Sequence, residues 1–120
     1  MANPFCHTEL STDNPGKARE FYGKLFDWKF DEMKSPFGSV TMIKPGEGPG
    51  GSLMAKRMAE APTAWLPYVQ VDSVEATLDK ARKLGATIVV DKQPIPEMGA
   101  FAVFIDPTGA ALGIWENAGK

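Results

Sequence analysis

Two residues near the N-terminus, His7 and Glu9, are of types that perform acid–base chemistry, and they stand two positions apart. In a β-strand, side chains at this spacing lie on the same face of the sheet. Histidine titrates near neutral pH, so the pair could act as a general base with its orienting carboxylate, or as half of an unorthodox metal site. The alternative is a neutral histidine and a partly solvated glutamate on a half-buried sheet, because a pair without a nucleophile or metal is a weak sign of catalysis.

An internal repeat shows which elements must position these residues. The segment Glu9–Trp28 aligns with Tyr68–Thr87 at an offset of about 59 residues, and Gly38–Gly46 aligns with Ala100–Thr108 at an offset of about 62. A repeat of this length indicates two copies of one supersecondary unit. Positions that correspond in the two copies can therefore be compared residue by residue.

In the first copy the apolar pattern predicts strands over Phe5–Thr12, Ser39–Ile43 and Ser52–Met58, and a further strand that begins at Trp28–Phe30. A helix is predicted to begin at Asp13-Asn14-Pro15, because Asp or Asn can cap a helix and proline is favoured at its first position. The segment Pro45–Gly51 is rich in glycine and proline, which predicts a turn or a mobile loop, either a lid over a cleft or a simple connector.

The second copy repeats this order after a linker over Ala59–Thr63. Its helix is capped by Asp72 or Ser73, and its strands are predicted over Trp65–Val71, Thr87–Val90, Ala102–Ile105 and Ala111–Glu116. The expected fold class is α+β, with two βαβββ modules, about 1–58 and about 64–118, in a single domain of residues 1–120. We expect one curved mixed sheet with a concave cleft and with the helices on its outer face.

Composition excludes several classes of partner. The chain has 120 residues, is 43% hydrophobic and has a net charge of -2 with scattered basic residues, which argues against nucleic acid and anionic membranes. No apolar run approaches the roughly 20 residues of a membrane span, and the N-terminal residues MANPFCHTEL do not resemble a signal peptide. Because Cys6 is the single cysteine, no internal disulfide can form, and a cytoplasmic location is expected.

Three segments carry a resemblance to a known family: HTEL…FYGKLFDW, YVQVDSVEATLDKARKLGA and FAVFIDPTGAALGIWE. Together they resemble the vicinal oxygen chelate superfamily, which includes glyoxalase I, extradiol dioxygenases, fosfomycin-resistance enzymes and bleomycin-resistance binding proteins. The resemblance covers almost the whole chain and is specific for the fold. It implies no single activity, because the superfamily spans several chemistries and some members only bind.

The resemblance also implies where a divalent metal would be held, since metal-dependent members use one ligand from each of four strands, two per module. These positions fall here on His7, on Met54 or Ser52, on Leu66 and on Gly113. Leucine and glycine side chains supply no donor atom, and a thioether is a poor ligand for zinc, nickel or magnesium. We therefore expect no metal and no other cofactor.

The main hypothesis is a metal-free member that binds a small, partly apolar molecule in the cleft. The predicted ligand-binding residues are taken from the ligand positions that the resemblance implies, extended by strand alternation and by the repeat: His7, Glu9, Met54, Leu66, Tyr68, Gln70, Gly113 and Trp115. The alternative is a lyase or dioxygenase-like enzyme with a non-standard site, whose catalytic candidates are His7 and Glu9. The resemblance further implies a homodimer.

Overall fold

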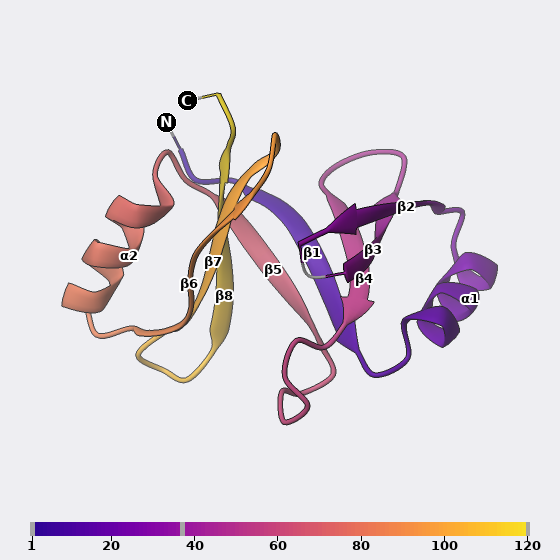
Figure 1. Ribbon diagram of the computed structural model, residues 1–120, viewed down its shortest axis with the longest axis horizontal. Coiled ribbons are helices and arrows are strands. Elements are labelled where there is room, and N and C mark those ends of the chain that lie inside the picture. Colours follow the sequence, from indigo (N-terminus) through magenta and orange to yellow (C-terminus); the bar gives the residue numbers. More distant parts are fainter. Residues whose placement is uncertain (1, 37, 120) are drawn as a thin grey trace. The chain divides into compact units, whose positions relative to one another are not determined.

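The computed structural model describes residues 2–36 and 38–119. Within these residues the βαβββ order occurs twice (Figure 1), which confirms the predicted α+β class and the two modules. The elements are β1 (Phe5–Thr12), α1 (Pro15–Leu25), β2 (Lys29–Ser35), β3 (Gly38–Lys44), β4 (Gly50–Ala55), β5 (Ala64–Gln70), α2 (Val74–Lys83), β6 (Thr87–Ile95), β7 (Gly99–Ile105) and β8 (Ala111–Asn117).

The chain divides into two compact units that nearly coincide with the modules. One, the His7 unit, comprises His7–Leu66, and the other, the Tyr68 unit, comprises Met1–Cys6 and Pro67–Lys120. The first residues join the Tyr68 unit through hydrogen bonds to Gln70. Asn3 Nδ2 donates to the Gln70 carbonyl at 2.9 Å, and the Gln70 N–H donates to the Pro4 carbonyl at 2.9 Å.

In the His7 unit the strands follow the order β2-β3-β4-β1, with β1 and β4 parallel and the other neighbours antiparallel. Helix α1 begins as the sequence predicts: Asn14 is the cap, its Oδ1 accepts from the Lys17 N–H at 3.1 Å, and proline follows it. The core consists of Leu10, Ile43 and Leu53, packed against residues of α1 and β2. Burying each such side chain contributes about 1.5–3 kcal/mol.

In the Tyr68 unit the order β5-β8-β7-β6 repeats the same arrangement, with β5 and β8 parallel. Ser73 caps α2, accepting from the Ala76 N–H at 3.1 Å. The apolar face of α2 packs on the sheet in a core of Val71, Val74, Leu78, Ala102 and Ile114. Glu116 Oε1 accepts from the Val74 N–H at 2.6 Å, so β8 also fixes the start of α2.

The structure corrects several predicted strand boundaries. Strand β4 begins at Gly50, so Pro45–Gly51 is not entirely loop, and it ends at Ala55 instead of Met58. Gly51 lies against β1, where a Cβ atom would approach the Thr8 carbonyl oxygen to 2.6 Å, which explains the glycine inside a strand. Strand β6 extends through Ile95, several residues beyond its predicted end at Val90, and β2, predicted to begin at Trp28–Phe30, runs through Ser35.

The two helices have 11 and 10 residues, about half the length that a membrane-spanning helix needs. Within residues 2–36 and 38–119, no helix combines sufficient length and apolar character to cross a membrane.

Candidate ligand site

One face of the His7 unit carries a row of hydrogen-bonded polar side chains. Leu10 and Leu53 pack in the core beside α1, so the residues that alternate with them point to the opposite face. On that face His7 Nε2 lies 2.9 Å from Ser52 Oγ, and Ser52 Oγ donates to Glu9 Oε2 at 3.1 Å. The parallel pairing of β1 with β4, which sets Glu9 opposite Ser52, produces this arrangement. We call it the His7–Ser52–Glu9 row.

The directions of these hydrogen bonds fix the histidine tautomer. A serine hydroxyl has one proton to donate, and Ser52 uses it on the Glu9 carboxylate. The bond between His7 and Ser52 must therefore run the other way, from the His7 Nε2–H to the Ser52 oxygen. His7 then carries its proton on Nε2 when the ring is neutral.

Burial sets the charge state of His7. Ser52 and Glu9 are only 1% and 7% exposed, so the row is shielded from water. Burial lowers the pKa of His7, while the nearby Glu9 carboxylate acts in the opposite direction and offsets only part of this effect. The ring is therefore neutral at physiological pH, where it can accept or donate a hydrogen bond.

Glu9 also has a cationic partner, Arg57, in the segment that follows β4. Arg57 Nη2 lies 3.7 Å from Glu9 Oε1, and the Arg57 side chain is 26% exposed. The neighbouring Lys56 holds this segment in place: its Nζ lies 3.2 Å from Asp13 Oδ1 and donates to the Ala61 carbonyl at 2.8 Å. The ion pair with Arg57 offsets part of the cost of burying the Glu9 carboxylate.

Apolar side chains surround the row on the same face. Met42 pairs with Ser52 across β3 and β4, and strand alternation adds Val40 and Met54. Val40 and Met54 are buried and Met42 is half-buried. Thioether side chains adapt their shape to neighbouring groups. Small-molecule sites typically combine a mostly apolar surface with a few polar groups, as this face does.

The corresponding position of the Tyr68 unit is filled by an aromatic ring. Tyr68 pairs with Gly113 across β5 and β8, the same register that pairs Glu9 with Ser52. A Cβ atom on Gly113 would lie 2.4 Å from Tyr68 Cδ2, so the ring occupies the space of a side chain there. Tyr68 is 4% exposed and meets the ring of Phe101 edge-on, with 6.3 Å between centroids.

The sequence left open whether Ser52 or Met54 corresponds to Gly113, and the common register of the two units decides this question. The counterpart of Gly113 in the first module is Ser52, because Ser52 pairs with Glu9 as Gly113 pairs with Tyr68. Met54 lies on the same face, two positions further along β4.

The structure brings the predicted site residues together in two groups, one in each unit. His7 and Glu9 meet through Ser52 in the first. In the second, Tyr68 pairs with Gly113 and Gln70 pairs with Trp115. Leu66, the last residue of the His7 unit, stands two positions before Tyr68 on β5. That both groups line one cleft stays a prediction.

Sequence reasoning missed Arg57 entirely. Glu9 on a half-buried strand needs a partner, and the sequence places two basic residues, Lys56 and Arg57, close to the end of the strand that pairs with it. The signal was obscured because the predicted strand ran to Met58, which placed Arg57 inside the sheet instead of in the segment after it.

The four positions that the resemblance assigns to metal ligands do not fit a divalent metal. The His7 Nε2 donates its proton to Ser52, Leu66 supplies no donor atom, and Gly113 has no side chain. Replacing Gly113 by a ligand residue would require the Tyr68 ring to move. Within the described part of the chain, no group of three or more His, Cys, Asp or Glu side chains is arranged to hold a metal ion.

Comparison with known proteins identifies relatives over most of the chain. "Putative glyoxylase CFP32" of Mycobacterium tuberculosis is 32% identical over 111 residues, which are 92% of this chain and 42% of that protein. "Anthracycline biosynthesis protein DnrV" of Streptomyces peucetius is 20% identical over 124 residues, covering 91% of this chain and 45% of that protein. The chain thus spans less than half the length of these curated relatives.

Solved structures share the fold at low sequence identity. A hypothetical protein, BH1468 from Bacillus halodurans, superposes with a TM-score of 0.74 at 16% identity, covering 100% of this chain and 98% of that one. Methylmalonyl-CoA epimerase from Mycobacterium tuberculosis gives a TM-score of 0.69 at 15% identity, covering 95% and 87%. These likenesses concern the fold alone.

The profile of one protein family matches residues 5–114, nearly the whole length of both modules. This match agrees with the repeated βαβββ order and with the 32% identity to the mycobacterial relative. The chain belongs to the glyoxalase/bleomycin resistance protein/dioxygenase superfamily.

Proposed function

We propose that this protein binds a small, partly apolar molecule on the face of the His7 unit that carries the His7–Ser52–Glu9 row. The buried row is the observation that carries the proposal. A neutral imidazole and a carboxylate, joined by a fully buried hydroxyl, are preorganised to hydrogen-bond one polar group of a ligand. The methionine and valine side chains around the row suit the apolar remainder.

The second unit supports binding without a metal. The second-module positions that the resemblance assigns to metal ligands are Leu66, which supplies no donor atom, and Gly113, where the Tyr68 ring occupies the space of a side chain. The family's description names a resistance protein beside two kinds of enzyme, so membership does not imply one activity and is compatible with this function.

The experiment is a thermal-shift screen of small neutral and charged aromatic compounds against the wild type, Ser52→Ala and His7→Gln. Compounds that stabilise the wild type should stabilise both variants less, each compared with its own ligand-free melting temperature. Thr63→Ala, in an exposed linker position, is the matched control and should respond like the wild type. Equal stabilisation of all four proteins would show that the row takes no part in binding.

A lyase or dioxygenase-like enzyme centred on His7 and Glu9 is the second candidate. It is favoured by the hydrogen-bonded link between a neutral histidine and a buried carboxylate, which is an arrangement that general bases use. The relative CFP32 carries the word glyoxylase in its name. Turnover of the hemithioacetal of methylglyoxal and glutathione by the wild type, lost in Glu9→Gln, would establish this activity. Absence of turnover by the wild type would exclude this substrate.

A homodimer and a cytoplasmic location complete the proposal. Phe21, Leu25 and Phe26 around the end of α1 are each about half exposed, and a partner copy would cover such apolar surface. The single free Cys6 suits a reducing compartment. Light scattering during size-exclusion chromatography tests the dimer, and a monomer at micromolar concentration would contradict it.

A further inference from the structure

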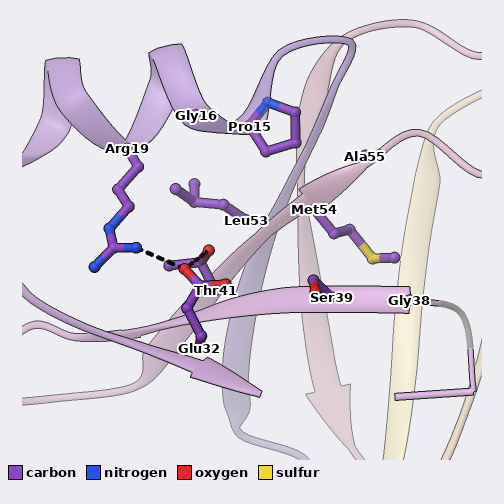
Figure 2. Close-up of a pocket in the computed structure, with 10 residues that line it drawn as sticks. All are labelled: Pro15, Gly16, Arg19, Glu32, Gly38, Ser39, Thr41, Leu53, Met54 and Ala55. Carbon is purple, nitrogen blue, oxygen red and sulfur yellow. Dashed lines mark hydrogen bonds and ion pairs between the residues drawn. The ribbon is translucent and has the colours of Figure 1, made fainter. Parts of the chain in front are cut away.

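A separate pocket of about 420 Å³ opens on the helix side of the His7 unit, where the first turn of α1 stands over β3 and β4 (Figure 2). We call it the α1 pocket. Thr41 and Leu53, which line it, face α1, whereas Ser52 faces the other side of the sheet. Met54, at the end of β4, also reaches its lining. The α1 pocket is thus distinct from the His7–Ser52–Glu9 row.

One wall of the α1 pocket is a fixed pair of opposite charges. Arg19 Nη1 donates to Glu32 Oε2 at 2.7 Å, and Thr41 Oγ1 donates to the same oxygen at 2.7 Å, as the dashed lines of Figure 2 show. The Arg19 guanidinium also lies over the ring of Phe30, 5.5 Å from its centroid. Three contacts therefore hold the pair in place, and its net charge is zero.

The other wall is apolar and is kept open by a glycine. Leu53 is buried beneath it, and Pro15 lines it at the start of α1. A Cβ atom on Gly16 would meet nothing closer than Asn14 Oδ1 at 3.9 Å, so packing does not require glycine there. Glycine is a poor helix former, yet it stands in the first turn, where a larger side chain would enter the pocket.

We propose that the α1 pocket binds a small neutral molecule in which a hydrogen-bond acceptor adjoins a donor, such as a primary amide, on an apolar body. The acceptor meets the Arg19 guanidinium and the donor meets the Glu32 carboxylate, while the apolar body lies on Leu53 and Pro15. An anion is repelled by Glu32 and a cation by Arg19, so the paired charges select a neutral group. The volume lies within the range of small-molecule sites.

The test compares three probes that share one ring and differ in charge: benzamide, benzoate and benzylammonium. Each is titrated to about 10 mM, a range suited to so small a ligand, while backbone amide shifts are followed by NMR. Benzamide should shift the amides of Gly16, Gly38 and Ser39 in a saturating way. Benzoate and benzylammonium should bind at least about tenfold more weakly.

Two substitutions of one residue provide the control. Gly16→Leu should fill the pocket and abolish the benzamide shifts, whereas Gly16→Ala, which adds one methyl group at the same open position, should retain them. Three results would overturn the proposal: no benzamide shifts at these amides, equal binding of a charged probe, or retained binding in Gly16→Leu. Shifts centred on Glu9 and Ser52 instead would assign the probe to the other face of the sheet and would also overturn it.

Discussion

The two modules use the same pair of strand positions in opposite ways. In the His7 unit the paired residues are Glu9 and Ser52, whose carboxylate and hydroxyl form a buried hydrogen bond of 3.1 Å. In the Tyr68 unit the paired residues are Tyr68 and Gly113, and the tyrosine ring covers the glycine. One position thus holds a polar group that can recognise a ligand, and its counterpart is closed by an aromatic side chain.

This difference shows that a duplicated scaffold can change its chemistry without changing its topology. Both units retain the parallel strand pair, the capped helix and the apolar core. What differs is the volume and polarity of two side chains. A glycine opposite a tyrosine and a serine opposite a glutamate each fill the space between paired strands, and in the second arrangement a side-chain hydrogen bond joins the two paired residues.

The largest expected effect comes from adding one methyl group beneath the Tyr68 ring. Gly113→Ala places a Cβ atom 2.4 Å from the ring, so either the ring or the strand must move. We expect a loss of roughly 3 kcal/mol in the free energy of unfolding, the upper range for overpacking, measured by urea denaturation. Gly16→Ala, with no atom closer than 3.9 Å, is the control and should be neutral or slightly stabilising.

A double-mutant cycle sharpens this prediction. Tyr68→Ala removes the ring that the new methyl group meets, so Gly113→Ala should cost little in that background. The two changes should couple by roughly 1–3 kcal/mol, as residues in contact do. Additive effects would mean that the ring does not occupy the space over Gly113.

The intermediate effect concerns the polar pair of the other module. Ser52→Ala removes the hydroxyl that joins His7 to Glu9 and leaves buried polar atoms without this partner. We expect a loss of about 2 kcal/mol, the cost of an unsatisfied buried group. Ser11→Ala, on the same face of β1 but half-exposed, should change the free energy of unfolding by less than about 0.5 kcal/mol. Equal losses in the two variants would contradict the special role of Ser52.

The smallest effect is a pH dependence that only the His7 unit should show. Burial lowers the pKa of His7 below its ordinary value of 6.5, so on acidification the unfolded chain binds a proton before the folded protein does. The stabilisation is complete above pH 6.5 and is lost as the pH falls through the pKa of the folded state. Between pH 7.5 and 5.5 the free energy of unfolding should fall by at most about 1.4 kcal/mol per pH unit, and His7→Gln should flatten this slope. An unchanged slope in His7→Gln would assign the effect to other groups.

Much of the fold followed from local sequence signals. Asn14 and Ser73 cap the helices because their side chains accept hydrogen bonds from nearby backbone amides, and both positions were among those predicted. The strand ends were harder. The composition of Pro45–Gly51 predicted that Gly50 and Gly51 lie in a loop. In the structure both lie in β4, and the Thr8 carbonyl approaches Gly51 too closely for a larger side chain. Such a contact depends on register, which the sequence does not state.

The sequence predicted only part of the candidate site, because its contacts also depend on the register between strands. Alternation predicts that His7 and Glu9 share one face of β1, and both side chains contact Ser52. That Tyr68 and Gln70 face a ligand stays a prediction. Alternation could not show that Ser52 bridges the first pair or that the Tyr68 ring covers Gly113, because these contacts join strands that are distant in sequence. Arg57 was missed because its role depends on where β4 ends.

The hydrogen-bonded row of the His7 unit is the central claim, and the state of one imidazole tests it most directly. His7 is the only histidine of the chain, so its ring nitrogens give a single set of signals in long-range proton–nitrogen NMR spectra. At pH 7.5 the row predicts a neutral ring protonated on Nε2, which donates to Ser52. A charged ring, or a neutral ring protonated on Nδ1, would contradict it.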